Sequence, residues 1–373
     1  MGPSEELRHL AERVRAAAQE GHALELVGQA SKRFYGEAPR GTPWVLSREP
    51  ALRGLRAYEP AERVVTVGAA TPLAELEAQL AAHGQHLACE PPRFGGEGSV
   101  GGLIATGLAG PARAYEGGVR DALLGLTLVD GQGQLLKFGG TVMKNVAGFD
   151  VARLMVGAMG TLGLIVEASF KLSPLPAATL TLRFDSPMQD DALYAMQQAA
   201  LQGLPLSASA WWNGSLLLRL SGSPEALTAA ARRLGGDAFP PELAAAFWAG
   251  LRHQSDEFFV GAVRALQAGS GVSVWRLSLP ATAPVIAAPG EQLVEWGGAL
   301  RWLVTPLKPA AVRELAERAG GHATLYAAQD KNCPVFTPVN GAHRQIQQRL
   351  KQRFDPKGIF NPGRLGAESA ELA

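Results

Sequence analysis

Two dense glycine blocks within residues 91–172 constrain the fold of this chain more than any other feature. The first block, PPRFGGEGSVGGLIATG, begins at Pro91, and the second, GTLGLIVE, begins at Gly160. A glycine has no Cβ, so its N–H can approach a ligand closely and its φ can be positive. Successive exposed N–H groups form a concave nest for phosphate oxygens. The blocks therefore predict a backbone pressed against a flat or anionic ligand.

Composition narrows the class of protein further. The chain has 373 residues, enough for two domains, and its 35 basic residues nearly balance its 34 acidic ones. No long Lys or Arg run is present, which argues against nucleic acid as a partner. No apolar stretch reaches membrane-spanning length, and the first residues read as a charged helix, so we expect a cytoplasmic protein.

Two cysteines, Cys89 and Cys333, lie far apart in the sequence. An iron–sulfur cluster normally takes four protein ligands, so any such cluster must belong to a partner. A disulfide between them is not expected in a cytoplasmic protein. The sequence predicts no metal site.

Hydrophobic periodicity predicts alternating helices and strands in the first half of the chain. In residues 4–20 the apolar side chains recur at helical spacing, which predicts a helix. A second helix is expected to begin at Pro72, with Thr71 as its N-cap, and to end near Gly84. Asp130-Gly131-Gln132-Gly133 is a strong turn signal between hairpin strands. The expected strands are 23–27, 44–47, 63–67, 126–129, 135–138 and 162–172, and a further helix is expected over 150–159 with Asp150 as its cap.

A Ser-Pro-Leu-Pro segment at 173–176 marks the expected domain boundary. Beyond it, short strands alternate with Ala-rich helices, and 281–291 reads as a loop. The expected strands are 179–184, 216–220, 272–279 and 323–326, and the expected helices are 191–202, 224–234, 310–319 and 344–354.

The two glycine blocks, the segment VMKNVAGFD at Val142 and the closing segment DPKGIFNPGR at Asp355 resemble the vanillyl-alcohol-oxidase/PCMH-type FAD-binding superfamily. Within it they are most similar to the FAD-binding E subunits of bacterial glycolate oxidase (glycolate dehydrogenase), over residues 24–365. The resemblance implies an α+β fold. A PCMH-type FAD-binding domain of two α+β subdomains would span 1–176, a smaller α/β cap (FAD-linked oxidase-like) domain 177–340, and a C-terminal helix and return segment 341–373.

The resemblance also implies which residues hold FAD. The loop at 28–32 would cradle the pyrophosphate, although the family is usually richer in glycine where Gln29 and Ala30 stand. The implied residues are Gly28, Gln29, Ala30, Ser31, Lys32, Pro91, Pro92, Gly95, Gly96, Ser99, Val100, Gly101, Gly102, Thr106, Gly107, Gly110, Asn145, Val146, Ala147, Gly148, Gly160, Thr161, Leu162, Gly163 and Ile165.

Simpler interpretations stand beside this one. Residues 28–32 could be a plain strand-to-loop turn, and the first glycine block a surface loop, although apolar Leu103 and Ile104 argue against the latter. A nicotinamide-binding Rossmann turn would follow the first strand of a βαβ unit, whereas the glycines at 157–160 follow a predicted helix, so we reject it. Ser31 stands where covalent relatives carry a linking residue, so we expect non-covalent FAD; Cys89 reads as a small buried hydrophobe.

Residues for catalysis are harder to identify. Oxidising a 2-hydroxy acid requires a base, an arginine for the carboxylate and a path for hydride. The seven histidines are scattered and form no H-x-G-D-G-N-x-H block. His322 is a candidate base or a structural histidine, and Lys144 is a candidate cation for reduced flavin or a solvated lysine. Arg364 and Arg301 could pair with a carboxylate or with a protein acid.

By resemblance, the expected function is the FAD-binding subunit of a complex that oxidises glycolate, a small 2-hydroxy acid, to glyoxylate. A paralogous FAD-linked subunit would carry substrate chemistry, and an iron–sulfur subunit would take the electrons. The complex would reach the inner membrane only through its partners. Two alternatives remain open: a self-sufficient FAD-dependent 2-hydroxy-acid or alcohol oxidoreductase, and a non-catalytic assembly subunit.

Overall fold

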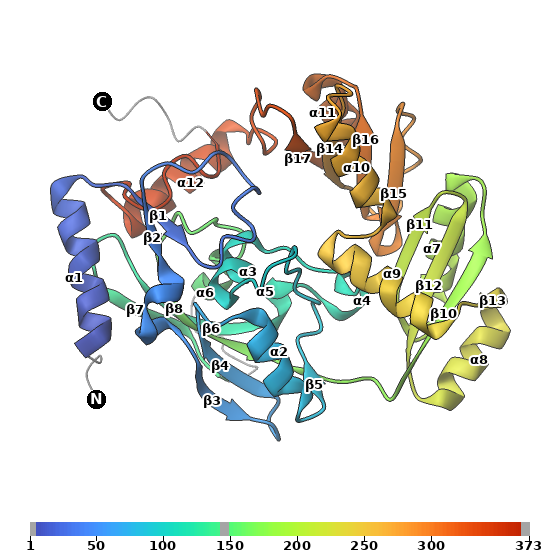
Figure 1. The fold of residues 1–373 in the computed structure, drawn as a ribbon, viewed down its shortest axis with the longest axis horizontal. Helices are drawn as coiled ribbons and strands as arrows, with labels where there is room; N and C mark the ends of the chain where they lie inside the picture. The colour runs from blue at the N-terminus through green and yellow to red at the C-terminus, as the bar shows by residue number, and fades with distance from the viewer. Residues whose placement is uncertain (1–4, 142–148, 367–373) are drawn as a thin grey trace.

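The computed structural model describes residues 5–141 and 149–366, which form two lobes (Figure 1). The first lobe contains a five-stranded antiparallel sheet in the order β3-β4-β8-β6-β7 and a separate parallel pair, β1-β2. These strands are β1 (Leu24–Val27), β2 (Thr42–Val45), β3 (Leu55–Glu59), β4 (Val64–Gly68), β6 (Leu123–Val129), β7 (Leu135–Gly139) and β8 (Leu164–Lys171). The short strands β5 (Gln85–His86) and β9 (Ser173–Pro174) pair with each other.

Helices cover both faces of the five-stranded sheet. Helix α1 (Glu5–Glu20) buries Leu10, Ala11, Val14 and Ala17 at helical spacing, in one core with Trp44 and Phe360. On the other face, α2 (Leu73–Ala81) and α3 (Val100–Thr106) pack against the sheet with the end of α12 (Gly341–Phe354). Three single-turn helices complete the lobe: α4 (Arg113–Glu116), α5 (Val119–Ala122) and α6 (Val151–Leu154). The expected mixed helix-and-sheet fold is confirmed.

Two local predictions for this lobe were wrong. Pro72, not Thr71, caps α2, because the Thr71 hydroxyl instead accepts a hydrogen bond from the Gly54 N–H at 2.8 Å. The helix expected over 150–159 ends after one turn, although Asp150 does cap it through the Arg153 N–H. Beyond that turn, the N–H groups of Gly157 and Met159 donate to carbonyls of residues 104 and 105 in α3. These long-range bonds replace the helical ones.

The second lobe is built on one eight-stranded antiparallel sheet in the order β13-β10-β12-β11-β15-β16-β14-β17. Its strands are β10 (Ala178–Asp185), β11 (Leu206–Trp212), β12 (Ser215–Gly222), β13 (Asp237–Ala238), β14 (Ser273–Ser278), β15 (Glu291–Glu295), β16 (Leu300–Thr305) and β17 (His322–Ala328). The four strands predicted here are present as β10, β12, β14 and β17. Strands β11, β13, β15 and β16 were not predicted.

Two helix layers enclose this sheet. Helices α7 (Gln189–Leu201), α8 (Pro224–Leu234) and α11 (Pro309–Arg318) pack into two cores with it. Helices α9 (Pro241–His253) and α10 (Glu257–Gln267), which were not predicted, pack into a separate core. That core also contains Tyr35, Leu108 and Met159 from the first lobe. The α9–α10 side of the sheet therefore adjoins the first lobe.

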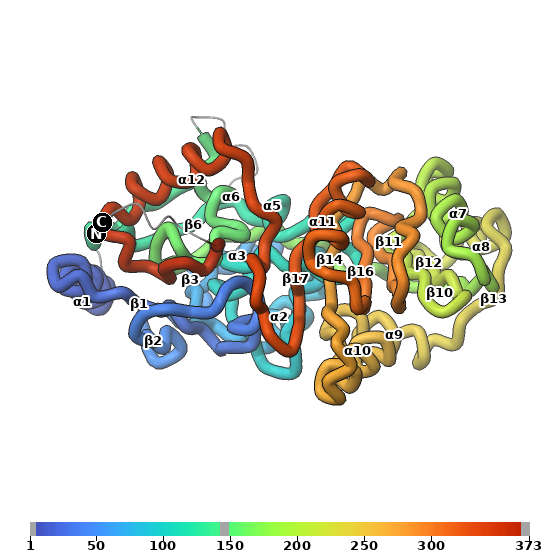
Figure 2. Tube along the Cα trace, turned by 90° about the horizontal axis from the view of Figure 1, so that it is seen from above, coloured from blue at the N-terminus to red at the C-terminus, as the bar shows by residue number. Residues whose placement is uncertain are grey.

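After β17 the chain returns to the first lobe, where α12 lies (Figure 2). The segment that follows joins β1: Leu24 N–H donates to the Ile359 carbonyl at 2.7 Å, and Asn361 N–H donates to the Leu24 carbonyl at 2.9 Å. Lys351 fixes this return by donating to the Thr161 carbonyl, the Asp355 carboxylate and the Phe360 carbonyl. No helix in the described ranges is both long and apolar enough to cross a membrane.

Candidate functional site

A large cavity lies in the first lobe, between the β1–β2 pair with its following loop and the five-stranded sheet with α3. It encloses about 870 Å³ of space, part of it open to solvent, within the range of cofactor sites. Most of its lining comes from four segments: residues 25–33, the 99–106 block, the 159–165 block, and Asn361 with Arg364 from the return segment; Leu46, Ala69 and Ala70 complete it. The site therefore joins residues far apart in the sequence.

The loop at 28–32 lines this cavity and contains backbone N–H groups that are unpaired within the described residues. Among the described residues, the N–H groups of Gln29, Ala30, Ser31 and Lys32 have no hydrogen-bond acceptor. Ala30 has a left-handed backbone (φ 58°), which is uncommon for a residue other than glycine. Unpaired N–H groups beside a left-handed residue form an anion-binding nest.

Lys32 adds a full positive charge to this loop. Its side chain is buried, and its Nζ has no hydrogen-bond partner within residues 5–141 and 149–366. The centroid of the Phe94 ring lies 5.4 Å from Nζ. Burial lowers the pKa of Lys32 to about 8, against a smaller opposing effect of Glu77. A buried cation without a partner is costly, and the charge of Lys32 favours a negatively charged group, such as a pyrophosphate, in the cavity that this residue lines.

The first glycine block forms the opposite wall. Ser99 caps α3 by accepting the Gly102 N–H at 3.2 Å, and Gly101 N–H donates to the Ala69 carbonyl at 2.7 Å. A Cβ on Gly101 would lie 3.1 Å from that carbonyl oxygen, and one on Gly102 would lie 3.1 Å from Ser99 Oγ. Both distances are tighter than ordinary contacts, so the two glycines let α3 pack closely against Ala69 and Ser99 where it lines the cavity.

The structure brings about half of the predicted cofactor residues to this cavity. Those lining it are Gly28, Gln29, Ala30, Ser31, Lys32, Ser99, Gly101, Gly102, Thr106, Gly160, Gly163 and Ile165. Not lining it are Pro91, Pro92, Gly95, Gly96, Val100, Gly107, Gly110, Thr161 and Leu162. Of these, Val100, Thr161 and Leu162 are buried in the lobe, and Pro92 and Gly110 line a second cavity. Asn145, Val146, Ala147 and Gly148 lie outside the described residues.

Asn361 is a cavity residue that the sequence analysis did not single out. Its Oδ1 accepts the Leu26 N–H and its Nδ2 donates to the Met159 carbonyl, both at 2.7 Å. It thereby ties together three of the segments that line the cavity. The only sequence signal for Asn361 was its position in the closing segment DPKGIFNPGR. That segment did not indicate that the side chain contacts Leu26 and Met159.

The catalytic candidates do not come together. His322 is exposed at the start of β17 and lines neither cavity, and Lys144 lies outside the described residues. Arg364 lines the large cavity, but its guanidinium donates to the carbonyls of Arg33, Tyr35 and Glu37. Arg301 likewise donates to backbone carbonyls, those of Gly298, Pro284 and Ala283. The described ranges contain no group of three or more His, Cys, Asp or Glu that could hold a metal ion.

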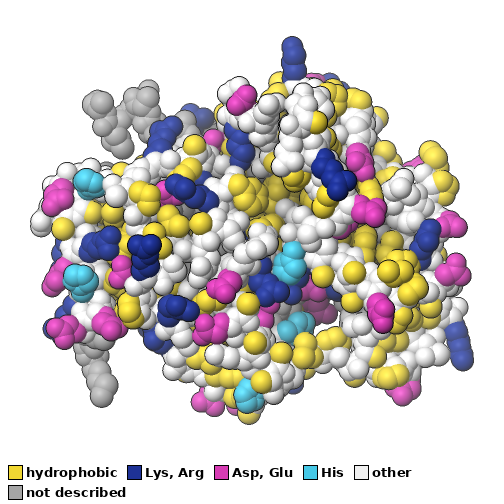
Figure 3. Space-filling model, viewed as in Figure 1, with side chains coloured by type: hydrophobic (Ala, Val, Ile, Leu, Met, Phe, Trp, Pro, Cys, Tyr) yellow, Lys and Arg dark blue, Asp and Glu magenta, His cyan; other side chains and the backbone are white. Residues whose placement is uncertain are grey.

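A second, smaller cavity lies where the two lobes meet. Phe94 and Leu108 line it from the first lobe, and Gln254, Arg276 and Glu295 from the second. Phe94 also contacts Lys32 of the large cavity, so the two cavities are neighbours. In Figure 3 acidic, basic and histidine side chains lie together along the boundary between the lobes.

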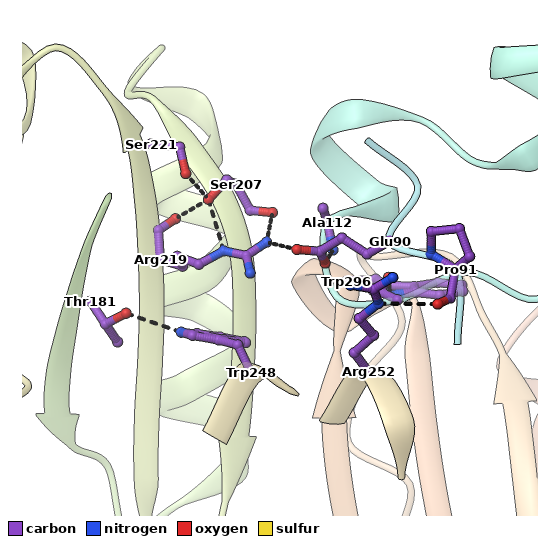
Figure 4. Close-up of polar contacts among 11 residues, drawn as sticks. Glu90, Pro91, Ala112, Thr181, Ser207, Arg219, Ser221, Trp248, Arg252 and Trp296 are labelled. Atoms are coloured by element: carbon purple, nitrogen blue, oxygen red, sulfur yellow. Dashed lines mark hydrogen bonds and ion pairs between the residues drawn. The ribbon is translucent and has the colours of Figure 1, made fainter. Parts of the chain in front are cut away.

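Polar contacts join the lobes beside this second cavity (Figure 4). The Trp296 indole N–H donates to the Gly110 carbonyl at 3.0 Å, and Arg252 Nε donates to the Pro91 carbonyl at 3.1 Å. Arg252 also pairs with Glu77. These contacts hold the second lobe against residues 90–112 of the first.

Comparison with known proteins agrees with this geometry. Residues 5–139 match the family model described as FAD binding domain. The chain is 42% identical to glycolate oxidase subunit GlcE of Escherichia coli K12, over 96% of this chain and 97% of that protein. It is 32% identical to a D-lactate dehydrogenase of Archaeoglobus fulgidus, over 39% of this chain and 32% of that enzyme. A solved structure of alkyldihydroxyacetonephosphate synthase shares the fold, with a TM-score of 0.62 and 15% identity over 94% of this chain and 74% of that one.

Proposed function

Because this chain belongs to the family of the glycolate oxidase subunit GlcE, we propose that it is the FAD-binding subunit of a complex that oxidises glycolate to glyoxylate. The observation that carries the proposal is the extent of the match, which covers both chains almost from end to end. It includes the second lobe and the return segment, which the FAD-binding family model leaves out. The coarser conclusion is direct: the chain is a member of a FAD-dependent oxidoreductase family.

FAD is the cofactor of this family, and the large cavity fits it. The unpaired N–H groups at 29–32 and the buried Lys32 ammonium would hold its pyrophosphate, and Gly101 and Gly102 would let the backbone pass beside it. No His, Cys or Tyr among the described residues lines this cavity, which supports non-covalent binding. When bound, FAD supplies a group that accepts two electrons together and passes them on singly.

The proposal assigns onward electron transfer to an iron–sulfur partner and substrate chemistry to a paralogous FAD-linked subunit. In support of a partner, this chain has only Cys89 and Cys333, too few for a cluster. Cys89 is buried, which raises the pKa of its thiol to about 12. The complex would be cytoplasmic and peripheral to the inner membrane through its partners. The domain limits 1–176, 177–340 and 341–373 form part of the same proposal.

The test is a visible spectrum of the chain purified alone, recorded before and after anaerobic addition of glycolate. A flavin spectrum that glycolate does not bleach, but that bleaches once the partner subunits are added, is the expected result. Bleaching of the isolated chain would instead favour a self-sufficient oxidoreductase, an alternative that the second cavity beside the large one supports. A folded chain that takes up no FAD would overturn the proposal in favour of an assembly role.

A further inference from the structure

The backbone carbonyls of residues 33–37, directly after the loop at 28–32, all accept hydrogen bonds from two cations. Arg364 donates to the carbonyls of residues 33 (3.3 Å), 35 (2.6 Å) and 37. Lys331 Nζ donates to the carbonyls of residues 34 (2.6 Å) and 36 (3.5 Å). The two side chains therefore alternate along the segment, and together they hold every carbonyl in it.

Hydrogen bonds join this segment to the loop that lines the large cavity. Arg33 N–H donates to the Ala30 carbonyl at 3.0 Å, and Tyr35 N–H donates to the Lys32 carbonyl at 3.1 Å. The Ala30 carbonyl and the unpaired Ser31 N–H belong to one planar peptide unit, so the first of these bonds also fixes the direction of that N–H. The cations that hold residues 33–37 thereby restrain the loop at 28–32.

Lys331 reaches the segment from residues 329–340, the connection between β17 and α12, which we call the strap (Figure 2). Val335 of the strap binds both lobes. Its carbonyl accepts the Leu325 N–H of β17 at 2.9 Å, and its N–H donates to Glu37 Oε1 at 2.6 Å. The strap therefore links the sheet of the second lobe to the segment that follows the cavity loop in the first.

The charges of Lys331 and Arg364 also act on each other. The pKa of Lys331 is lowered by burial and by the charge of Arg364, whereas Glu37 raises it. Burial likewise lowers the pKa of Arg364, against the opposing charges of Glu25 and Glu37. Neither cation forms an ion pair within residues 5–141 and 149–366, where both donate to neutral carbonyls. An anion in the cavity that Arg364 lines would reduce their repulsion.

We infer that Lys331 is a positioning residue for FAD: by holding the carbonyls of residues 33–37 with Arg364, it keeps the loop at 28–32 in the arrangement that binds the pyrophosphate. The inference rests on the proposed FAD-binding function and deepens it. Lys331 does not line the cavity, so it acts through the backbone and not by touching the cofactor. Because such coupling is reciprocal, FAD bound in the first lobe also stabilises the strap.

The first test compares FAD dissociation constants, measured by flavin fluorescence as FAD is titrated into the cofactor-free protein. Lys331→Met loses both carbonyl contacts and should bind FAD about fivefold more weakly. Lys331→Arg keeps the charge and the donors and should restore most of the affinity. Lys308→Met removes an exposed lysine beside α11 and is the matched control, with unchanged affinity.

Amide hydrogen exchange distinguishes positioning from a general loss of stability, and it needs no FAD. The N–H groups of residues 33, 35 and 37 are hydrogen-bonded. In cofactor-free Lys331→Met they should exchange about threefold faster or more, while the amides of α1 and β14 keep their rates. Faster exchange throughout the protein would show a purely structural role, and unchanged exchange at residues 33–37 would also overturn the inference.

The unaltered chain provides a further measurement that does not depend on any variant. FAD should slow exchange of the Val335 N–H, although the strap does not line the cavity, and no effect of FAD there would contradict the coupling. Failure of the inference and failure of the proposed function give different results. FAD bound equally tightly by Lys331→Met would overturn the inference alone, whereas no FAD uptake by the unaltered chain would overturn both.

Discussion

The Glu90 carboxylate lies 2.8 Å from the Arg219 guanidinium and joins the first lobe to the β12 strand of the second (Figure 4). Each partner has further contacts on its own side. Glu90 Oε2 accepts the Ala112 N–H at 2.8 Å, and Arg219 donates to Ser207 and lies 5.2 Å from the centroid of the Trp248 ring. Both side chains are less than one-fifth exposed. The pair is therefore well placed to fix the two lobes relative to each other.

Removing one charge of this pair should destabilise the protein. Glu90→Gln keeps an acceptor for Ala112 but leaves Arg219 unpaired and mostly buried, with an expected loss of about 2 kcal/mol in the free energy of unfolding. Urea unfolding measures it. Glu314→Gln breaks the exposed pair with Arg318 and is the control, with an expected loss below about 0.5 kcal/mol. Equal losses in both variants would show that the lobe contact contributes little.

A larger side chain at Gly102, in the first glycine block, should displace FAD. The side chain of Gly102→Val would lie against Ser99 Oγ and occupy space beside the backbone of the large cavity. We expect a folded protein with less than about a tenth of the normal flavin-to-protein absorbance ratio. Gly261→Val places the same side chain on α10, where a Cβ would meet no atom within 4 Å, and should keep its FAD. Stoichiometric FAD in folded Gly102→Val would place the cofactor elsewhere.

Lys32→Met should affect FAD affinity and cofactor-free stability in opposite directions. Without the ammonium, FAD should dissociate about tenfold more readily, because one charge-assisted contact is lost. The cofactor-free protein should become more stable, since a buried cation without a partner has been replaced by an apolar chain of similar length. Fluorescence titration gives the affinity and thermal unfolding the stability. A destabilised cofactor-free variant would mean that Lys32 has a structural role.

The lowered pKa of Lys32 predicts how the stability of the cofactor-free protein depends on pH. The folded pKa of about 8 is below the ordinary value of 10.5, so between these values the unfolded chain binds more protons. Stability of the cofactor-free protein should therefore rise from pH 8 towards pH 10.5 by up to about 3 kcal/mol relative to Lys32→Met, which lacks this titration. Parallel pH profiles for the two proteins would contradict the assignment.

Ionisation of Glu295 should make the protein less stable, not more stable, as the pH rises. Burial raises its folded pKa to about 8 from an ordinary 4.5, so the folded state binds the extra proton between these values, and stability is lost as the pH rises from 4.5 through 8. Glu295→Gln retains an acceptor for Trp302 but does not ionise. It should match the original protein near pH 4.5 and exceed its stability by about 2 kcal/mol or more above pH 8. Urea unfolding at both pH values is the measurement.

Local signals were sufficient for much of the fold. The amphipathic spacing of residues 4–20 predicted α1, and the turn at Asp130 predicted the β6–β7 hairpin, because both patterns depend only on neighbours in the sequence. Helices α9 and α10 were missed although signals were present: Pro241 stands at the first turn of α9, and Asp256 caps α10 through the Phe259 N–H.

The candidate site was only partly accessible to sequence reasoning. Glycine density and resemblance pointed to the 28–32, 99–106 and 159–165 segments, which the structure gathers around one cavity. The lack of a partner for Lys32 among the described residues could not be inferred, because burial and pairing depend on residues brought from other parts of the chain. The same holds for Arg301 and Arg364, whose guanidinium groups bind backbone carbonyls.

The return of the C-terminal segment to β1 has a consequence for biosynthesis. The Leu26–Asn361 contact links residues 335 positions apart, and a ribosome adding 5–20 residues per second needs roughly 20–70 s to make the intervening chain. During that interval β1 and the loop at 28–32 have emerged, but Asn361 and Arg364 have not. A nascent or prematurely terminated chain thus lacks part of the cavity wall. The cavity wall is therefore completed only when the closing segment has been made.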